Sequence, residues 1–359
     1  MAETTDGYYF MNGSFLFYAD KSRMQSIPVC DRPDCLHDKE TDPTKTYLCN
    51  AFLSIPTPTR SFLTIYHNQL YVLSYLDVTT GDTNPKLIKI SIDGSKRQTE
   101  FIFPPETYAM TMHRGYLYYV ERDESNGKTT LRRHKIGKSQ KQSELIYTSD
   151  IFGANIFDII AFGNNLYFRE SGNIDGEYTN RATHYDLISN EISQIFKKDT
   201  QSYCGMPQVI DGKLYCEIWD SLDSKISPTY VSDLKGNNMQ QVFTKEMSDT
   251  ACADDQFFYY GKGEQSQKDE SFTHTISISD TKGNEIDSIS TNQIHSRYFD
   301  FIPGNDRHLF IWFLNEKEMC YYWIDKSKIG SGHLELHELL KQDFQSALPE
   351  IQYNATSHP

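Results

Sequence analysis

One short pattern recurs seven times along this chain: a turn rich in Asn, Asp or Gly, followed by an apolar and aromatic strand. The strand residues that anchor the successive copies are Tyr8, Leu70, Leu117, Leu166, Leu214, Phe257 and Leu309. Successive anchors lie 62, 47, 49, 48, 43 and 52 residues apart. A unit of roughly 48 residues has the size of a four-stranded propeller blade, whereas a β-sandwich has no reason to keep such a period. We therefore predict an all-β fold, a single β-propeller domain over residues 1–359. It has seven blades of four antiparallel strands, or six as the alternative.

The second copy of the repeat shows how a blade is encoded. Runs of apolar, β-branched and aromatic residues predict its strands at Phe62–His67, Leu70–Leu76, Leu87–Ile92 and Gln98–Phe103. The dipeptide Asp93-Gly94 separates the last two runs and is a strong signal for a tight hairpin turn. We write the four strands of a blade as a to d, from the inside of the ring outwards.

The first copy departs from the repeat in two ways. Only six residues precede its strand b, which leaves too little chain for an inner strand a. We expect the C-terminal segment 340–359, with a strand at Ala347–Tyr353, to supply that strand and close the ring; an incomplete first blade is the alternative. The spacing to the second copy is the longest of all, and we place an insertion there, residues 30–50, between blades 1 and 2.

This insertion carries the most specific local motif of the chain. Cys30, Cys35, His37 and Cys49 place three thiols and one imidazole within 20 residues. Zinc prefers four tetrahedral ligands of this kind, and a closed set would be structural rather than catalytic. The insertion is too short to form its own core, so a metal ion could order it. A disulfide among the three cysteines is the competing interpretation, and free thiols are a third.

The chain has seven cysteines, an odd number that excludes complete pairing within one chain. Four of them, Cys204, Cys216, Cys252 and Cys320, lie in or beside predicted strands, where we expect them to be small buried apolar residues. A Cys204–Cys216 disulfide is the alternative if the protein is exported.

The charge of the chain argues against nucleic acid as a partner. Lys and Arg number 35 and Asp and Glu 49, which gives a net charge of −14. An acidic surface repels phosphate backbones. No apolar run reaches the roughly 18 residues of a membrane helix. The polar start, Met1–Gly7, fits a cytoplasmic chain and equally a chain whose export signal has been removed.

The turns between strands b and c are predicted to form a polar recognition face. These segments are Asp77–Pro85, Arg122–Lys128, Ser171–Asn180 and Asp220–Pro228. Because successive strands of a blade run in opposite directions, these turns lie on the same face of the ring as the connections between blades. Such a face can bind a protein, a peptide or a glycan, although surface loops are polar in any case. Trp219, Trp312 and Trp323 either stack on sugars or pack in the core.

Catalytic signatures are weak. The sequence contains no Gly-rich phosphate loop, no Gly-x-Ser-x-Gly and no His-Glu-x-x-His. Asp158 and Asp300 occupy equivalent places in strands a and would line the channel, as an acid and base or as solvated side chains. His333 and His337 are a candidate metal pair or an ordinary surface pair. We assign no catalytic and no cofactor-binding residue.

The order of these motifs resembles a known group. A propeller strand is followed by Cys30, Cys35 and His37, then by Cys49-Asn50-Ala51, then by repeats with Leu-Tyr strands and Asp-Gly turns. This is similar to uncharacterised bacterial surface lipoproteins with TolB-like or low-density-lipoprotein-receptor-like β-propellers. The resemblance implies export and a lipid anchor outside this chain, with a cytoplasmic location as the alternative.

Three functions follow as hypotheses. The first is a non-catalytic, extracytoplasmic binding module for a protein, peptide or glycan. The second is a propeller glycan hydrolase or lyase that uses channel carboxylates. The third is a purely structural module of an envelope complex. An enzyme should gather ionisable groups with perturbed pKa values in one pocket, whereas a binding module should expose an aromatic or apolar patch.

Overall fold

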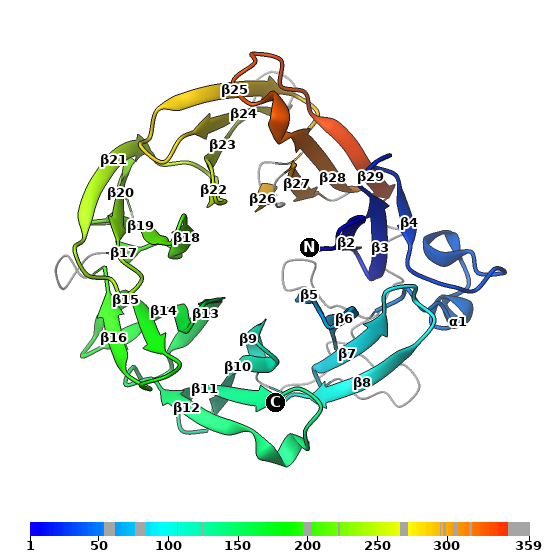
Figure 1. Ribbon diagram of the computed structural model, residues 1–359, viewed down its shortest axis with the longest axis horizontal. Helices are drawn as coiled ribbons and strands as arrows, with labels where there is room; N and C mark the ends of the chain where they lie inside the picture. Colours follow the sequence, from blue (N-terminus) through cyan, green and yellow to red (C-terminus); the bar gives the residue numbers. More distant parts are fainter. Residues whose placement is uncertain are drawn as a thin grey trace, which may run out of the picture.

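The computed structural model is a ring of seven antiparallel sheets (Figure 1). It describes residues 1–53, 62–75, 84–105, 107–123, 125–196, 203–221, 223–265, 272–294, 296, 299–303, 307–315 and 318–343. Within these residues six sheets have four strands, and the fifth has five because its inner strand is split in two. The predicted all-β propeller of seven blades is confirmed.

The strands of blades 1 to 3 are β1 (Ala2–Glu3), β2 (Gly7–Asn12), β3 (Phe15–Asp20), β4 (Ser26–Pro28); β5 (Leu63–Tyr66), β6 (Gln69–Ser74), β7 (Lys86–Ser91), β8 (Arg97–Ile102); and β9 (Thr107–His113), β10 (Tyr116–Asp123), β11 (Lys128–Lys135), β12 (Glu144–Thr148). Those of blades 4 and 5 are β13 (Asn155–Phe162), β14 (Asn165–Ile174), β15 (Glu177–Asp186), β16 (Ile192–Ile195); and β17 (Tyr203–Cys204), β18 (Gln208–Ile210), β19 (Lys213–Trp219), β20 (Ile226–Ser232), β21 (Gln240–Glu246). Those of blades 6 and 7 are β22 (Thr250–Ala253), β23 (Phe258–Gln265), β24 (Phe272–Ser279), β25 (Glu285–Thr291); and β26 (Phe299–Pro303), β27 (His308–Leu314), β28 (Glu318–Asp325), β29 (His337–Asp343). The helical turns are η1 (His37–Lys39), α1 (Pro43–Thr46), η3 (Gln140–Gln142) and η4 (Lys326–Lys328).

Blade 2 follows the predicted strands closely. The strands β5 to β8 pair in sequence order, each with its neighbour. The turn between β7 and β8 contains Gly94 with φ of +74°, a conformation that side chains disfavour. A Cβ at Gly94 would lie 2.6 Å from the carbonyl oxygen of Val29, so close contact with blade 1 also requires glycine here.

The inner strand of blade 1 is present, and the expectation that it is missing was wrong. Ala2 and Glu3 form β1, in register with Tyr9 and Tyr8 of β2. Two residues are enough to form this strand because both of them pair with the longer strand β2. The proposed closing strand, Ala347–Tyr353, lies outside the described residues, as does the whole of 344–359.

The hydrophobic core lies between the blades rather than within them. One cluster, for example, combines Tyr9, Met11 and Leu16 of blade 1 with Leu70 and Val72 of blade 2. The tyrosines of strand b add polar links, because their hydroxyls reach the outer turn of the next blade. The Tyr9 hydroxyl donates to the carbonyl oxygen of Ile92 at 2.9 Å, and that of Tyr167 to Leu234 at 2.7 Å. These two tyrosines therefore link blade 1 to blade 2 and blade 4 to blade 5.

Candidate functional site

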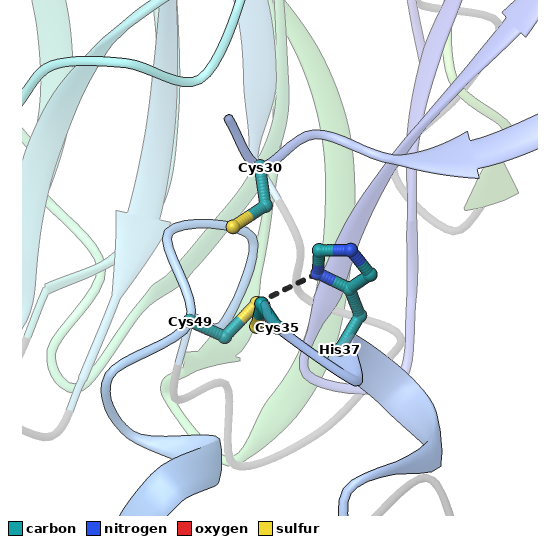
Figure 2. A group of neighbouring side chains, drawn as sticks. All are labelled: Cys30, Cys35, His37 and Cys49. Atoms are coloured by element: carbon teal, nitrogen blue, oxygen red, sulfur yellow. Dashed lines mark hydrogen bonds between the residues drawn. The ribbon is translucent and has the colours of Figure 1, made fainter. Parts of the chain in front are cut away.

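The insertion brings its four predicted ligands together (Figure 2). Cys30 follows β4, Cys35 precedes η1, His37 is the first residue of η1, and Cys49 follows α1. Their sulfur and imidazole nitrogen atoms all lie within 4.8 Å of one another. Among the described residues, this is the group of His, Cys, Asp and Glu side chains arranged to hold a metal ion. Figure 1 shows α1 at the outer edge of the ring, away from the centre.

The donor set suits a soft, four-coordinate cation. Zinc–sulfur bonds of about 2.3 Å imply ligand–ligand distances of roughly 3.7 Å in a tetrahedron. The Cys49 Sγ and His37 Nδ1 atoms are 3.6 Å apart. All seven cysteines of the chain are free thiols in this structure. Three thiols and one imidazole, converging on one point, fit a closed structural zinc site.

Local contacts explain why the two arms of the insertion face each other. The Arg32 guanidinium donates to the carbonyl oxygen of Leu48 at 2.7 Å, and the Asn50 amide donates to Asp31 Oδ1 at 2.8 Å. His37 has a φ of +55°, a left-handed conformation that costs a non-glycine residue roughly 1 kcal/mol.

Burial raises the pKa of the Cys49 thiol, and the neighbouring Cys35 and Cys30 raise it further. A bound cation would stabilise the thiolate form of Cys49, which burial and the neighbouring thiols disfavour in its absence.

A second feature lies where blade 3 connects to blade 4. The side chain of Phe152 is 78% exposed, although its neighbour Ile151 is buried. The Gly153 amide donates to the carbonyl oxygen of Gly127 at 2.7 Å, which fixes this connection to the turn between β10 and β11. A Cβ at Gly127 would lie 2.4 Å from the Phe152 ring, so glycine there makes room for the aromatic. The exposed ring therefore lies against Gly127, in a connection that is hydrogen-bonded to blade 3.

The neighbouring hairpin extends this surface. The predicted loop Ser171–Asn180 is wrong as a loop, because β14 and β15 pair through Ile174 and Glu177. The polar side chains of this segment can belong to paired strands because the hairpin projects into solvent. Tyr178, which is 49% exposed, stacks on Tyr203 of blade 5 with ring centroids 6.0 Å apart.

No sequence pattern pointed to Phe152 as a functional residue. An aromatic residue beside an apolar one predicts a buried strand. Phe152 is exposed because of the path that the chain takes between blades 3 and 4. The other predicted loops are described in part: residues 76–83, 124 and 222 lie outside the described residues.

The two channel carboxylates do not form a pair. Asp158 binds Arg169 through an ion pair of 2.9 Å, and Asp300 lies on β26 of blade 7. Figure 1 shows β13 and β26 on opposite sides of the centre. Asp300 reaches solvent, and desolvation by the surrounding protein still raises its pKa. Burial also raises the pKa of Glu217 in blade 5. These acids do not form the close pair that acid–base chemistry on a glycosidic bond requires.

The three tryptophans and the two histidines differ in their surroundings, and Trp219 is half-buried at the end of β19. Trp312 is buried, and Trp323 stacks on His337 with ring centroids 4.4 Å apart. Trp323 and His337 line a groove of about 660 Å³ on the outer side of blade 7, which reaches Arg23 in blade 1. His333 is exposed in the loop before β29.

The remaining thiols match the expectation of small core residues. Cys204, Cys216 and Cys320 are buried, and Cys252 is half-buried. Burial raises the pKa of Cys216 and Cys252. Among the described residues, the helices are all too short and too polar to cross a lipid bilayer.

Comparison with known proteins identifies the fold. No family model and no curated protein matches the sequence. A prolyl endopeptidase, studied for the role of inter-domain dynamics in catalysis and specificity, matches with a TM-score of 0.57 and 12% identity, over 94% of this chain and 49% of that chain. Prolyl oligopeptidase B from Galerina marginata, solved with a 35mer hydrolysis and macrocyclization substrate, matches with a TM-score of 0.57 and 9% identity, over 94% of this chain and 50% of that chain.

The chain spans about half the length of these two enzymes. At such low identity the likeness concerns the fold alone. The chain is a seven-bladed β-propeller similar in fold to the propeller domains of prolyl oligopeptidases.

Proposed function

We propose that this propeller is a non-catalytic binding module whose partner is a protein or peptide. The observation that carries the proposal is the exposed Phe152 ring on its fixed support. Burying a phenylalanine side chain yields about 1.5–3 kcal/mol, and aromatic anchors of this kind dominate protein interfaces. An exposed aromatic side chain is typical of a protein or peptide interface, where aromatic residues are enriched, and we therefore favour a protein or peptide over a glycan.

Replacement of Phe152 tests this proposal. We expect Phe152→Ala to weaken peptide binding at least about tenfold, because truncation of a hot-spot residue costs about 2 kcal/mol or more and about 1.4 kcal/mol is already tenfold. Stability should change by less than about 0.5 kcal/mol, because the ring is mostly exposed. Peptide and glycan arrays probed with labelled wild-type protein would supply a ligand, and titration of the tightest peptide would give its Kd.

Phe162 provides the matched control. It is 43% exposed and ends β13, at the opposite end of the strand from Phe152. Phe162→Ala should therefore bind like the wild type. Binding that is unchanged in Phe152→Ala, or array signals from glycans alone, would contradict the proposal.

We further propose that Cys30, Cys35, His37 and Cys49 hold a structural zinc ion. The convergence of three sulfurs and one nitrogen supports this, and the four side chains fill a tetrahedral set without an open position. A disulfide among the same cysteines is the competing chemistry.

Metal analysis of protein purified without chelator should find about one zinc per chain. Cys30→Ser should lose the metal because it removes one of four ligands. Cys252→Ser, which changes a thiol outside the cluster, should retain it. Less than about one-tenth equivalent of zinc, together with a Cys30–Cys49 or Cys30–Cys35 disulfide by mass mapping, would refute the assignment.

We also propose that the chain works outside the cytoplasm, held by a lipid anchor; the support for this is the resemblance of its motifs to those of surface lipoproteins. Protease accessibility on intact cells, with a cytoplasmic protein as the reference, would test this location.

A further inference from the structure

The contact between blade 1 and blade 7, which we call the closing joint, differs from the other contacts in the ring. Every other pair of neighbouring blades is connected by the polypeptide. Within the described residues, the sheet of blade 1 contains only β1 to β4 and that of blade 7 only β26 to β29. Neither blade takes a strand from the other there, and in the described part of the chain the two blades are held together by side-chain contacts.

The interior of the closing joint is aromatic. Tyr8, Phe10, Phe15 and Phe17 of blade 1 form one buried cluster with residues of blade 7, namely Phe310, Trp312, Met319, Tyr321 and Leu339. Polar contacts cross it as well. The Tyr8 hydroxyl and His308 Nδ1 are 2.8 Å apart, and the Tyr321 hydroxyl donates to the carbonyl oxygen of Met11 at 2.7 Å.

The Cys/His insertion enters this joint directly. Cys49 is buried within the aromatic cluster, and Cys30 and Cys35 pack against it. Asp38, the residue after the ligand His37, accepts a hydrogen bond from the Gln342 amide of β29 at 2.7 Å. The same Gln342 accepts one from Asn12 of β2 at 2.6 Å. The insertion, blade 7 and blade 1 are therefore linked in one chain of hydrogen bonds.

The far end of the insertion is fastened to blades 1 and 2. The Leu16 amide donates to Ala51, and the Leu53 amide donates to Ser14, at 2.9 and 2.7 Å. The Arg97 guanidinium of β8 donates to the carbonyl oxygen of Phe52 at 2.9 Å. Between these points, regular structure amounts to η1 and α1, three and four residues long. Such a segment needs cross-links to keep Asp38 and Cys49 in place.

We propose that metal binding by the insertion locks the closing joint, in place of a strand shared between the first and last blades. The metal fixes His37, and with it Asp38, against Gln342, and it keeps Cys49 in the aromatic cluster. This inference rests on the zinc site proposed above. Loss of the metal releases the insertion, and the joint then opens more readily than any other contact in the ring.

Amide hydrogen exchange of the full chain, with zinc and after removal of zinc by chelator, tests the lock. Removal should speed exchange at least about tenfold in β2, β3, β28 and β29, because opening of the joint exposes these strands. The strands β14 and β15 of blade 4 serve as the internal reference and should change less than about twofold.

Gln342→Ala separates the lock from the metal site. It removes the hydrogen-bond link and leaves all four ligands, so it should keep one zinc and still exchange faster in β29. Gln241→Ala, an exposed glutamine in blade 5, is the matched control and should behave as wild type. If the protein binds zinc but its removal leaves exchange in β2, β3, β28 and β29 unchanged, the proposed lock is wrong and the zinc site remains. A uniform increase around the ring would also overturn it, and failure to bind zinc would remove both proposals.

Discussion

Glu170→Ala should destabilise the protein by about 3–5 kcal/mol, the typical cost of removing one partner from a buried ionic network. The Glu170 carboxylate is fully buried in β14. It accepts hydrogen bonds from the hydroxyls of Tyr147, Ser149 and Thr183 at 2.7–3.0 Å. The Arg181 guanidinium donates to it at 3.2 Å and also pairs with Asp150.

This network joins two blades, which explains the size of the expected effect. Tyr147 and Ser149 belong to the outer edge of blade 3, whereas Glu170 and Arg181 belong to blade 4. Without the carboxylate, a guanidinium that is only 16% exposed loses its buried partner, and three hydroxyls lose their acceptor.

Two further variants make this test specific. Glu170→Gln keeps the volume and some acceptors and should cost less, about 1.5–3 kcal/mol. Glu144→Ala removes a carboxylate that is 59% exposed and pairs with Arg133, so it should cost below about 1 kcal/mol. Urea unfolding at pH 7 would measure all three. Similar costs for Glu170→Ala and Glu144→Ala would contradict the buried-network interpretation.

Acid should weaken the closing joint through His308. Burial lowers the pKa of this imidazole to about 4, from an ordinary value of 6.5. The charged groups that also act on it are Asp325, Arg307, Lys21 and Glu3. Between these two pKa values the unfolded chain binds a proton that the folded chain does not. The contribution of His308 to the free energy of unfolding is therefore fully present above pH 6.5. It decreases as the pH falls, by about 3 kcal/mol at pH 4.

The measurement compares wild type and His308→Gln in urea at pH 7.5 and pH 4.5. The variant loses the contact with Tyr8 at both pH values, and it lacks the proton-dependent loss. The difference in unfolding free energy between the two proteins should therefore shrink as the pH falls. A difference that stays constant with pH would show that His308 is not the responsible group.

The sequence predicted the ring because its signals are local. Alternation within each strand and a turn before an apolar, aromatic strand recur seven times, and each depends on residues near one another in the chain. The strands of blade 2 and the ligand set Cys30, Cys35, His37 and Cys49 were found in this way. The two-residue strand β1 was missed, since Ala2 and Glu3 carry no strand signal of their own and only their pairing with β2 defines it.

Contacts between distant parts of the chain were decided by tertiary structure alone. Asp38 and Gln342 are 304 residues apart in sequence, and Tyr8 and His308 are 300 apart. Phe152 is exposed, and Glu170 buried, because of how neighbouring blades meet. The repeat by itself predicted seven blades, with six as the alternative, and located the Cys/His insertion between the first two. Closure of the ring placed that insertion against the last blade, because local patterns specify single blades, whereas contacts between blades depend on side chains that meet only once the ring has formed.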